Sequence, residues 1–173
     1  MKDKMINLLS LLCGSALLVW LDQYTKHLAV AKLKGQEPFS VVPGVFELLY
    51  SENRGAAFGM LQGRQGFFFV VGIVVLAAAV YVMVRMPSYG CSRYHFLKVC
   101  TVMITAGAVG NMVDRVSQGY VVDFLYFRLI DFPIFNVADI YVTTATGLLL
   151  VLFLFYYKDE DFEIFRPGRR KGE

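Results

Sequence analysis

Two acidic side chains stand where an apolar chain tolerates them least. Asp123 lies at the end of the polar stretch Gly110 to Phe124, and Asp139 lies shortly after it, just ahead of an uncharged apolar run. A carboxylate at the edge of hydrocarbon is costly to keep charged, so intramembrane ionisable groups are candidates for a functional site. Two such carboxyls that meet would share one proton. Such a pair can take a proton from water and give one to a leaving amine, which is the chemistry of aspartic peptidases.

Each acid also has a purely structural interpretation. Asn136 is a good helix N-cap, and an acid three residues later favours the positive end of a helix, which would account for Asp139. Asp123 could be a solvated strand residue. The residues alone leave both interpretations open.

The composition indicates a membrane protein. The chain has 173 residues, 57% of them hydrophobic and 15% aromatic, with a mean hydropathy of +0.53, which is too apolar for an ordinary soluble domain of this size. A helix that crosses a bilayer needs roughly 17 to 25 apolar residues, and several runs reach or approach that length. They are Ile6 to Leu21, Gly66 to Val84, Phe96 to Val113 and Ile140 to Tyr157.

These runs predict an α-helical integral membrane protein with four transmembrane helices, at about residues 6–22, 66–84, 96–113 and 136–157. The first run passes into Trp20-Leu21-Asp22 without the small-residue cleavage site of a signal peptide, so we expect it to remain as a helix. The length allows one domain, and we expect a single membrane-embedded domain over residues 1–173 with a basic tail at 158–173.

The distribution of Lys and Arg predicts the orientation. Ten of the 17 basic residues lie at the N-terminus, in the loop from Arg85 to His95 with the adjoining Lys98, and in the tail after Tyr157. The positive-inside rule places these segments, and both termini, in the cytoplasm. The remaining loops would then face outward, and they contain the polar motifs. We interpret the basic tail as an orientation and lipid-headgroup signal, with no nucleic acid binding.

The outward loops have strand-like composition. Phe39 to Tyr50 is rich in Val, Phe, Leu and Tyr and is broken by Pro43-Gly44, which is typical of short strands joined by a turn. Tyr120 to Leu129 also favours a strand. We therefore expect a small extracytoplasmic sheet.

Several short blocks resemble a known family. They are Leu21-Asp22-Gln23-x-Thr25-Lys26, Asn53-x-Gly55-Ala56-Ala57-Phe58-Gly59, Gly110-Asn111-x-x-Asp114-Arg115-x-x-x-Gly119-x-Val121-x-Asp123-Phe124 and Phe135-Asn136-x-Ala138-Asp139. In this order, each at the outer side of a predicted span, they resemble the signature blocks of bacterial lipoprotein signal peptidase, also called signal peptidase II. The departures are Ala106, where glycine is common, and Ile140 and Tyr141, which replace smaller residues and could alter packing near the site.

The resemblance implies a four-helix membrane aspartyl endopeptidase with an extracytoplasmic β-sheet cradle, in which Asp123 and Asp139 are catalytic. It implies that the partner is a lipidated prolipoprotein, cut just before its diacylglyceryl-modified cysteine. Membrane lipids are the other expected partner. We expect a monomer in the bacterial cytoplasmic (inner) membrane, with the active site at the outer face.

Polar residues in the same blocks are candidates to hold the acids or the substrate. Asn111 and Asn136 carry amides that could orient the acid pair or the peptide backbone. Arg115 could hold a substrate carbonyl with its forked donors, or form an ion pair with Asp114 that ends the third span. For Asp114 we expect the structural role.

Two positions nearer the N-terminus extend this set. Asp22 and Lys26 lie four residues apart and could simply bridge along one helix face, whereas the resemblance implies a role in positioning lipid or substrate. Asn53 is expected to contact the substrate main chain. The small residues that follow it, beginning with Gly55, permit close approach of the backbone.

Two rival functions remain. A small membrane transporter also carries carboxylates within its helices, but usually near mid-membrane and in repeated halves, and no repeat is seen here. A metal-dependent phospholipid-processing enzyme would group Asp114 and Asp123 around Mg²⁺. We expect no metal site and no cofactor, because His27 and His95 fall on opposite predicted sides and no His-x-x-x-His pair exists.

Overall fold

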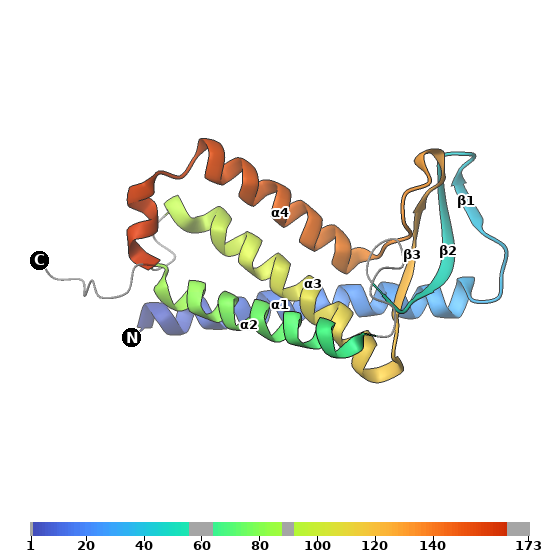
Figure 1. Ribbon diagram of the computed structural model, residues 1–173, viewed down its shortest axis with the longest axis horizontal. Coiled ribbons are helices and arrows are strands. Elements are labelled where there is room, and N and C mark those ends of the chain that lie inside the picture. Colours follow the sequence, from blue (N-terminus) through green and yellow to red (C-terminus); the bar gives the residue numbers. More distant parts are fainter. Residues whose placement is uncertain (1, 56–63, 88–91, 166–173) are drawn as a thin grey trace, which may run out of the picture.

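Long helices form the body of the molecule (Figure 1). The computed structural model describes residues 2–55, 64–87 and 92–165. Four helices in this part of the chain are long and apolar enough to cross a membrane, which confirms the expected count. They are α1 (Lys2–Leu33), α2 (Gln65–Arg85), α3 (His95–Gln118) and α4 (Val137–Phe155). Of these, α3 packs against each of the other three, so it is the central helix.

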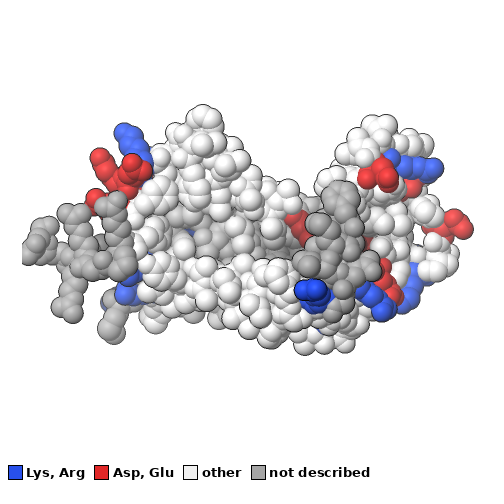
Figure 2. Space-filling model, viewed as in Figure 1, with Lys and Arg blue, Asp and Glu red and all other residues white. Residues whose placement is uncertain are grey.

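Charged side chains avoid the middle of this body. Figure 2 shows Lys, Arg, Asp and Glu gathered toward the two ends of the molecule, with a nearly uncharged belt between them. Large apolar side chains of the long helices are exposed, for example Leu17, Val74 and Leu150 at 66%, 61% and 61%. Exposed apolar surface of this extent is expected where lipid tails, not water, are the solvent.

Two helices run further than the apolar runs predicted. α1 continues through Asp22 and Lys26 to Leu33, because these two polar residues are buried against other helices and do not mark an exit to water. α3 continues through Asp114 and Arg115, so the expected helix end at this pair is wrong. It ends instead at Gly119, whose φ of 82° is the left-handed conformation that glycine adopts readily at a helix C-terminus.

A three-stranded antiparallel sheet lies across one end of the bundle, in the order β1-β2-β3 (Figure 1). Its strands are β1 (Phe39–Val42), β2 (Phe46–Asn53) and β3 (Val121–Phe127). The expected turn at Pro43-Gly44 joins β1 to β2, with Gly44 at a φ of 73°. In the β2–β3 pair, Ser51 lies opposite Asp123. The strand expectations are therefore confirmed, and β3 carries one of the two acids into the region where α4 begins.

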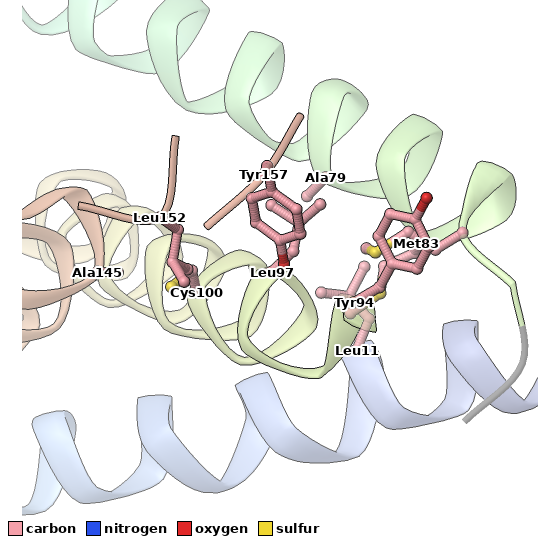
Figure 3. Packing of buried hydrophobic residues seen from close by; sticks show 10 residues of the cluster. Leu11, Ala79, Met83, Tyr94, Leu97, Cys100, Ala145, Leu152 and Tyr157 are labelled. Carbon is pink, nitrogen blue, oxygen red and sulfur yellow. The ribbon is translucent and has the colours of Figure 1, made fainter. Parts of the chain in front are cut away.

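The larger apolar core lies in the half of the bundle away from the sheet. Figure 3 shows its side chains in close-up, packed between the long helices. All four long helices contribute to it, with Leu11, Met83, Cys100 and Leu152 as examples. Short 3-10 segments complete the described chain: η2 (Ser92–Tyr94), η3 (Arg128–Ile130) and η4 (Asp159–Phe165). At the sheet end the apolar cluster is smaller, with Ala29, Val122 and Phe124 as its buried residues, and polar contacts hold the elements together there.

Candidate active site

The first turn of α4 fixes one acid. Asn136 is the N-cap: its Oδ1 accepts a hydrogen bond from the Asp139 backbone N over 3.0 Å, and Asp139 Oδ2 accepts one from the Asn136 backbone N over 3.1 Å. This reciprocal capping box satisfies two backbone donors and locks the side chain of Asp139. The other carboxylate oxygen of Asp139, Oδ1, accepts a hydrogen bond of 2.9 Å from Asn111 Nδ2 on α3. The capping interpretation of Asp139 is thus confirmed, and capping itself orients the carboxylate.

The second acid is not a solvated strand residue. Asp123 is 2% exposed, so that interpretation is wrong. Asn136 Nδ2 donates to its Oδ1 over 2.7 Å, and Asn53 Nδ2 donates to its Oδ2 over 2.9 Å. Burial, together with the charge of Asp139, raises the pKa of Asp123 to about 7, against the lowering effect of the two amide hydrogen bonds.

Asn136 is the residue that brings the acids together. Its side chain bonds to Asp123, its backbone N bonds to Asp139, and it is fully buried. Both acids line the same cavity of about 580 Å³. The site therefore holds two carboxyls within reach of one amide residue, in surroundings that disfavour two negative charges.

Two cavities with largely apolar walls adjoin at Asp139, and one of them also reaches Asp123. The cavity of about 580 Å³ lies between the sheet and α4, and a second, of about 630 Å³, lies between α2, α3 and α4. Figure 2 shows the surface hollowed between the helical body and the sheet. The residues common to both cavities are Phe68, Asn111, Arg115, Asp139 and Thr143. A long molecule with apolar ends and a polar centre fits such a pair of cavities.

Arg115 lines both cavities and does not pair with Asp114. Its Nη2 donates to Gly55 O over 2.9 Å, and its guanidinium lies 4.3 Å from the centre of the Phe68 ring. It therefore ties the start of the Asn53 block to α3 beside the acids. The rest of that block, residues 56–59, and the tail after Phe165 lie outside the described residues.

A buried ion cluster lies behind the acids. Lys26 Nζ lies 2.8 Å from Asp22 Oδ2 and 3.0 Å from Asp114 Oδ2. Asp22 Oδ1 accepts a bond of 2.9 Å from the Ala138 backbone N, and Asp114 Oδ2 accepts one of 3.1 Å from the Val122 backbone N. None of the three charged residues lines either of the two cavities beside the acids. All three are buried, and through Asp22 and Asp114 they hold the starts of α4 and β3 in place.

The structure thus sorts the predicted site residues into two groups. Those that line the cavity between the sheet and α4 are Asn53, Gly55, Asn111, Arg115, Asp123 and Asp139. Those that support it from behind are Asp22, Lys26, Asp114 and Asn136. Among the residues that the structure describes, no group of three or more His, Cys, Asp or Glu could hold a metal ion. The expectation of a site without metal stays a prediction.

Sequence reasoning missed three contributors. Gln23 Nε2 donates to Asp114 Oδ1 over 2.8 Å, and its place in the block that begins at Leu21 could have identified it. Gly110 lies where an added Cβ would come within 2.5 Å of Asp22 Oδ2, so its lack of a side chain permits the close approach of α1 and α3. Thr143 lies four residues after Asp139, on the same helix face, and this spacing could have identified it.

Comparison with known proteins agrees with the resemblance. The family model described as "Signal peptidase (SPase) II" matches residues 15–155. A lipoprotein signal peptidase of Streptococcus thermophilus is 42% identical over 83% of this chain and 90% of its own length. That of Caldanaerobacter subterraneus is 43% identical over 81% and 92%. A bacterial membrane enzyme solved by the in meso method at 2.3 Å has a TM-score of 0.75 at 32% identity, covering 94% of both chains. The chain therefore belongs to the signal peptidase II family.

Proposed function

We propose that this chain is an aspartic endopeptidase of the membrane that removes signal peptides from prolipoproteins by cutting just before the diacylglyceryl-modified cysteine. Family membership supports the removal of prolipoprotein signal peptides. The observation that carries the aspartic mechanism is the pair of buried Asp123 and half-buried Asp139, both bonded to Asn136 and both lining the cavity between the sheet and α4. A peptide bond flanked by an apolar signal segment and a lipid would fit there.

The environments of the two acids suggest separate roles in hydrolysis. Asp139 lies in the first turn of α4, where the positive helix end favours a carboxylate, so it takes the proton of the attacking water. Asp123, whose pKa burial raises to about 7, holds the shared proton and donates it to the substrate. The water oxygen bonds to the carbonyl carbon and the carbon–nitrogen bond breaks. The cysteine nitrogen leaves with a proton, and one proton remains on the pair.

The neighbouring donors would guide the substrate. Arg115 faces both cavities with a fork of donors suited to a carbonyl oxygen. Asn53, already bonded to Asp123, lies at the end of strand β2, where a substrate main chain could lie alongside. Since one chain supplies both acids and both cavities, we further propose that a monomer is active and that residues 1–173 act as a single domain.

The direct test is cleavage by the purified full chain in detergent. A diacylglyceryl-modified prolipoprotein should be cut, whereas the same prolipoprotein without the lipid should not. Mass spectrometry of the product should find the modified cysteine at the new N-terminus. If neither substrate is cut by well-folded protein, or if both are cut equally, the proposed function is wrong.

We also propose that the acids open to the outer face of the bacterial cytoplasmic membrane, because ten of the 17 basic residues of the sequence lie in the N-terminal segment, in the region 85–98 and after Tyr157, which the positive-inside rule assigns to the cytoplasm. A reporter that is active only outside the cytoplasm should stay silent when fused after Glu173. The matched insertion at Gly44, in the exposed turn between β1 and β2, should be active. The reverse pattern of activity would show that the orientation is inverted.

The raised pKa of Asp123 predicts how stability depends on pH. An unfolded Asp has a pKa of about 3.9, so the folded state holds this proton more tightly than the unfolded state. Its contribution to stability is present below about pH 4 and is lost as the pH rises through about 7. Asp123→Asn removes this dependence, so the melting temperature of the variant relative to wild type should increase by about 2–8 °C between pH 5 and pH 8.

The control for this prediction has the opposite sign. Hydrogen bonds from Arg93 lower the pKa of Asp161, which lies in η4 far from the acid pair. Asp161→Asn should therefore lower the melting temperature at pH 8. Parallel curves for wild type and Asp123→Asn from pH 5 to pH 8 would contradict the assignment of a raised pKa to Asp123.

A further inference from the structure

A lysine that lines neither of the two cavities beside the acids is bonded to the network that holds the acids. Lys26 is 2% exposed and lines neither of these cavities. Besides its two ion pairs with Asp22 and Asp114, its Nζ donates to Asn111 Oδ1 over 2.9 Å. An ammonium group has three donors, and these three bonds use all of them. The third bond serves no ion pair, and it is the one that leads toward the acid pair.

That bond fixes which end of the Asn111 amide faces the acids. Asn111 Oδ1 accepts from Lys26 Nζ and, over 3.1 Å, from Asn136 Nδ2. Asn111 Nδ2 donates to Asp139 Oδ1 over 2.9 Å. A turned amide would set its NH₂ group against two other donors and its oxygen against a carboxylate. The cation thereby keeps a hydrogen-bond donor directed at Asp139.

We propose that Lys26 is a positioning residue for the peptidase reaction, acting on Asp139 through Asn111, in addition to joining α1 to α3. This inference rests on the proposed function, because it concerns the acids as they act in turnover. Among the described residues, Lys26 from α1 and Arg115 from α3 are cations whose charges act on the acid pair, and Lys26 itself forms ion pairs with Asp22 and Asp114. Removal of Lys26 alone leaves the cluster more negative beside a pair that must keep one negative charge.

The same chain contains a matched control. Lys98 is also 2% exposed, and its Nζ also donates to an asparagine oxygen, Asn7 Oδ1, over 2.9 Å, as well as to Pro87 O over 2.8 Å. It lies at the end of the bundle away from the sheet, beside the larger apolar core. Loss of Lys98 removes a buried ammonium and its structural contacts without touching the acids.

The experiment compares Lys26→Gln, Lys26→Met, Lys98→Gln and Lys98→Met, with kcat and KM measured per folded molecule on the diacylglyceryl-modified prolipoprotein. Lys26→Met removes the donor and the charge, so kcat should fall by about 10- to 100-fold with little change in KM. Lys26→Gln keeps an NH₂ donor and should recover part of that loss. In both, the acidic limb of the pH profile should move to higher pH, because a nearby cation favours the ionised form of the pair. Both Lys98 variants should have a lower melting temperature than wild type, with unchanged kcat, KM and pH profile.

A folded Lys26→Met protein with wild-type kcat and pH profile would overturn the inference, as would an equal loss of kcat in Lys98→Met. If Lys26→Met does not fold, because two buried carboxylates lose their partner, the double variant Lys26→Met/Asp114→Asn removes one charge of each sign and is measured in its place. These outcomes are separate from failure of the proposed function. Normal cleavage by Asp123→Asn would exclude the aspartic mechanism whatever Lys26 does.

Discussion

Replacement of either acid by its amide should abolish turnover while the protein remains folded. Asp123→Asn and Asp139→Asn change the size of the side chain little, but an amide neither takes a proton from water nor gives one to a leaving amine. Since proton transfer by a positioned group contributes about 10²- to 10⁴-fold, kcat should fall by at least that range. Binding of the lipidated prolipoprotein should persist, because the apolar cavities and Arg115 are unchanged.

The double variant separates a cooperating pair from two independent residues. If Asp123 and Asp139 act as one unit, the double variant should be hardly worse than either single variant, since such residues are strongly non-additive. Wild-type activity should also fall on both sides of an optimum, as the pair becomes doubly protonated in acid or doubly ionised in alkali. Near-normal cleavage by either folded single variant, or activity abolished by a chelator and restored by divalent metal, would disprove the aspartic mechanism.

The hydrophobic pattern and the strand composition were sufficient to predict the elements of the fold. The helix ends were not predictable in the same way. The first span was predicted to end at residue 22, because Asp22 and Lys26 are charged. A single sequence does not show that Asp114, from another helix, pairs with the same lysine. The continuation of α3 past Asp114 has the same cause, since that carboxylate is used by α1 and by the backbone of β3.

The site was predictable as a set of residues but not as a network. The spacing of Asn136 and Asp139 indicated a helix cap, and the family resemblance indicated catalysis, as two competing interpretations. In the structure, capping is what directs Asp139, so the two interpretations are parts of one arrangement. Which residues line the cavity and which support it from behind depends on how β3 returns to the start of α4. No local sequence pattern predicts that return.

Asn136 should therefore be the most damaging position to change after the acids themselves, and its two roles should separate in two variants. Asn136→Ser keeps an N-cap oxygen for the Asp139 backbone N but loses the NH₂ group that bonds Asp123 over 2.7 Å. Asn136→Ala loses both. The alanine variant should be less stable than the serine variant by about 1 kcal/mol, the usual contribution of an N-cap.

Turnover should not follow that difference in stability. In both variants Asp123 Oδ1 loses the hydrogen bond from Asn136 Nδ2. Asn111 Oδ1 also loses one of its two donors. Because a misplacement of about 1 Å near the reacting atoms costs about 10²-fold, kcat per folded molecule should fall by that order in Asn136→Ser and Asn136→Ala alike. Thermal melting in detergent and single-turnover cleavage of the lipidated prolipoprotein measure the two effects separately. If Asn136→Ser cleaves at the wild-type rate, the amide only caps α4, and the acids must be held together by Asn53, Asn111 and the backbone alone.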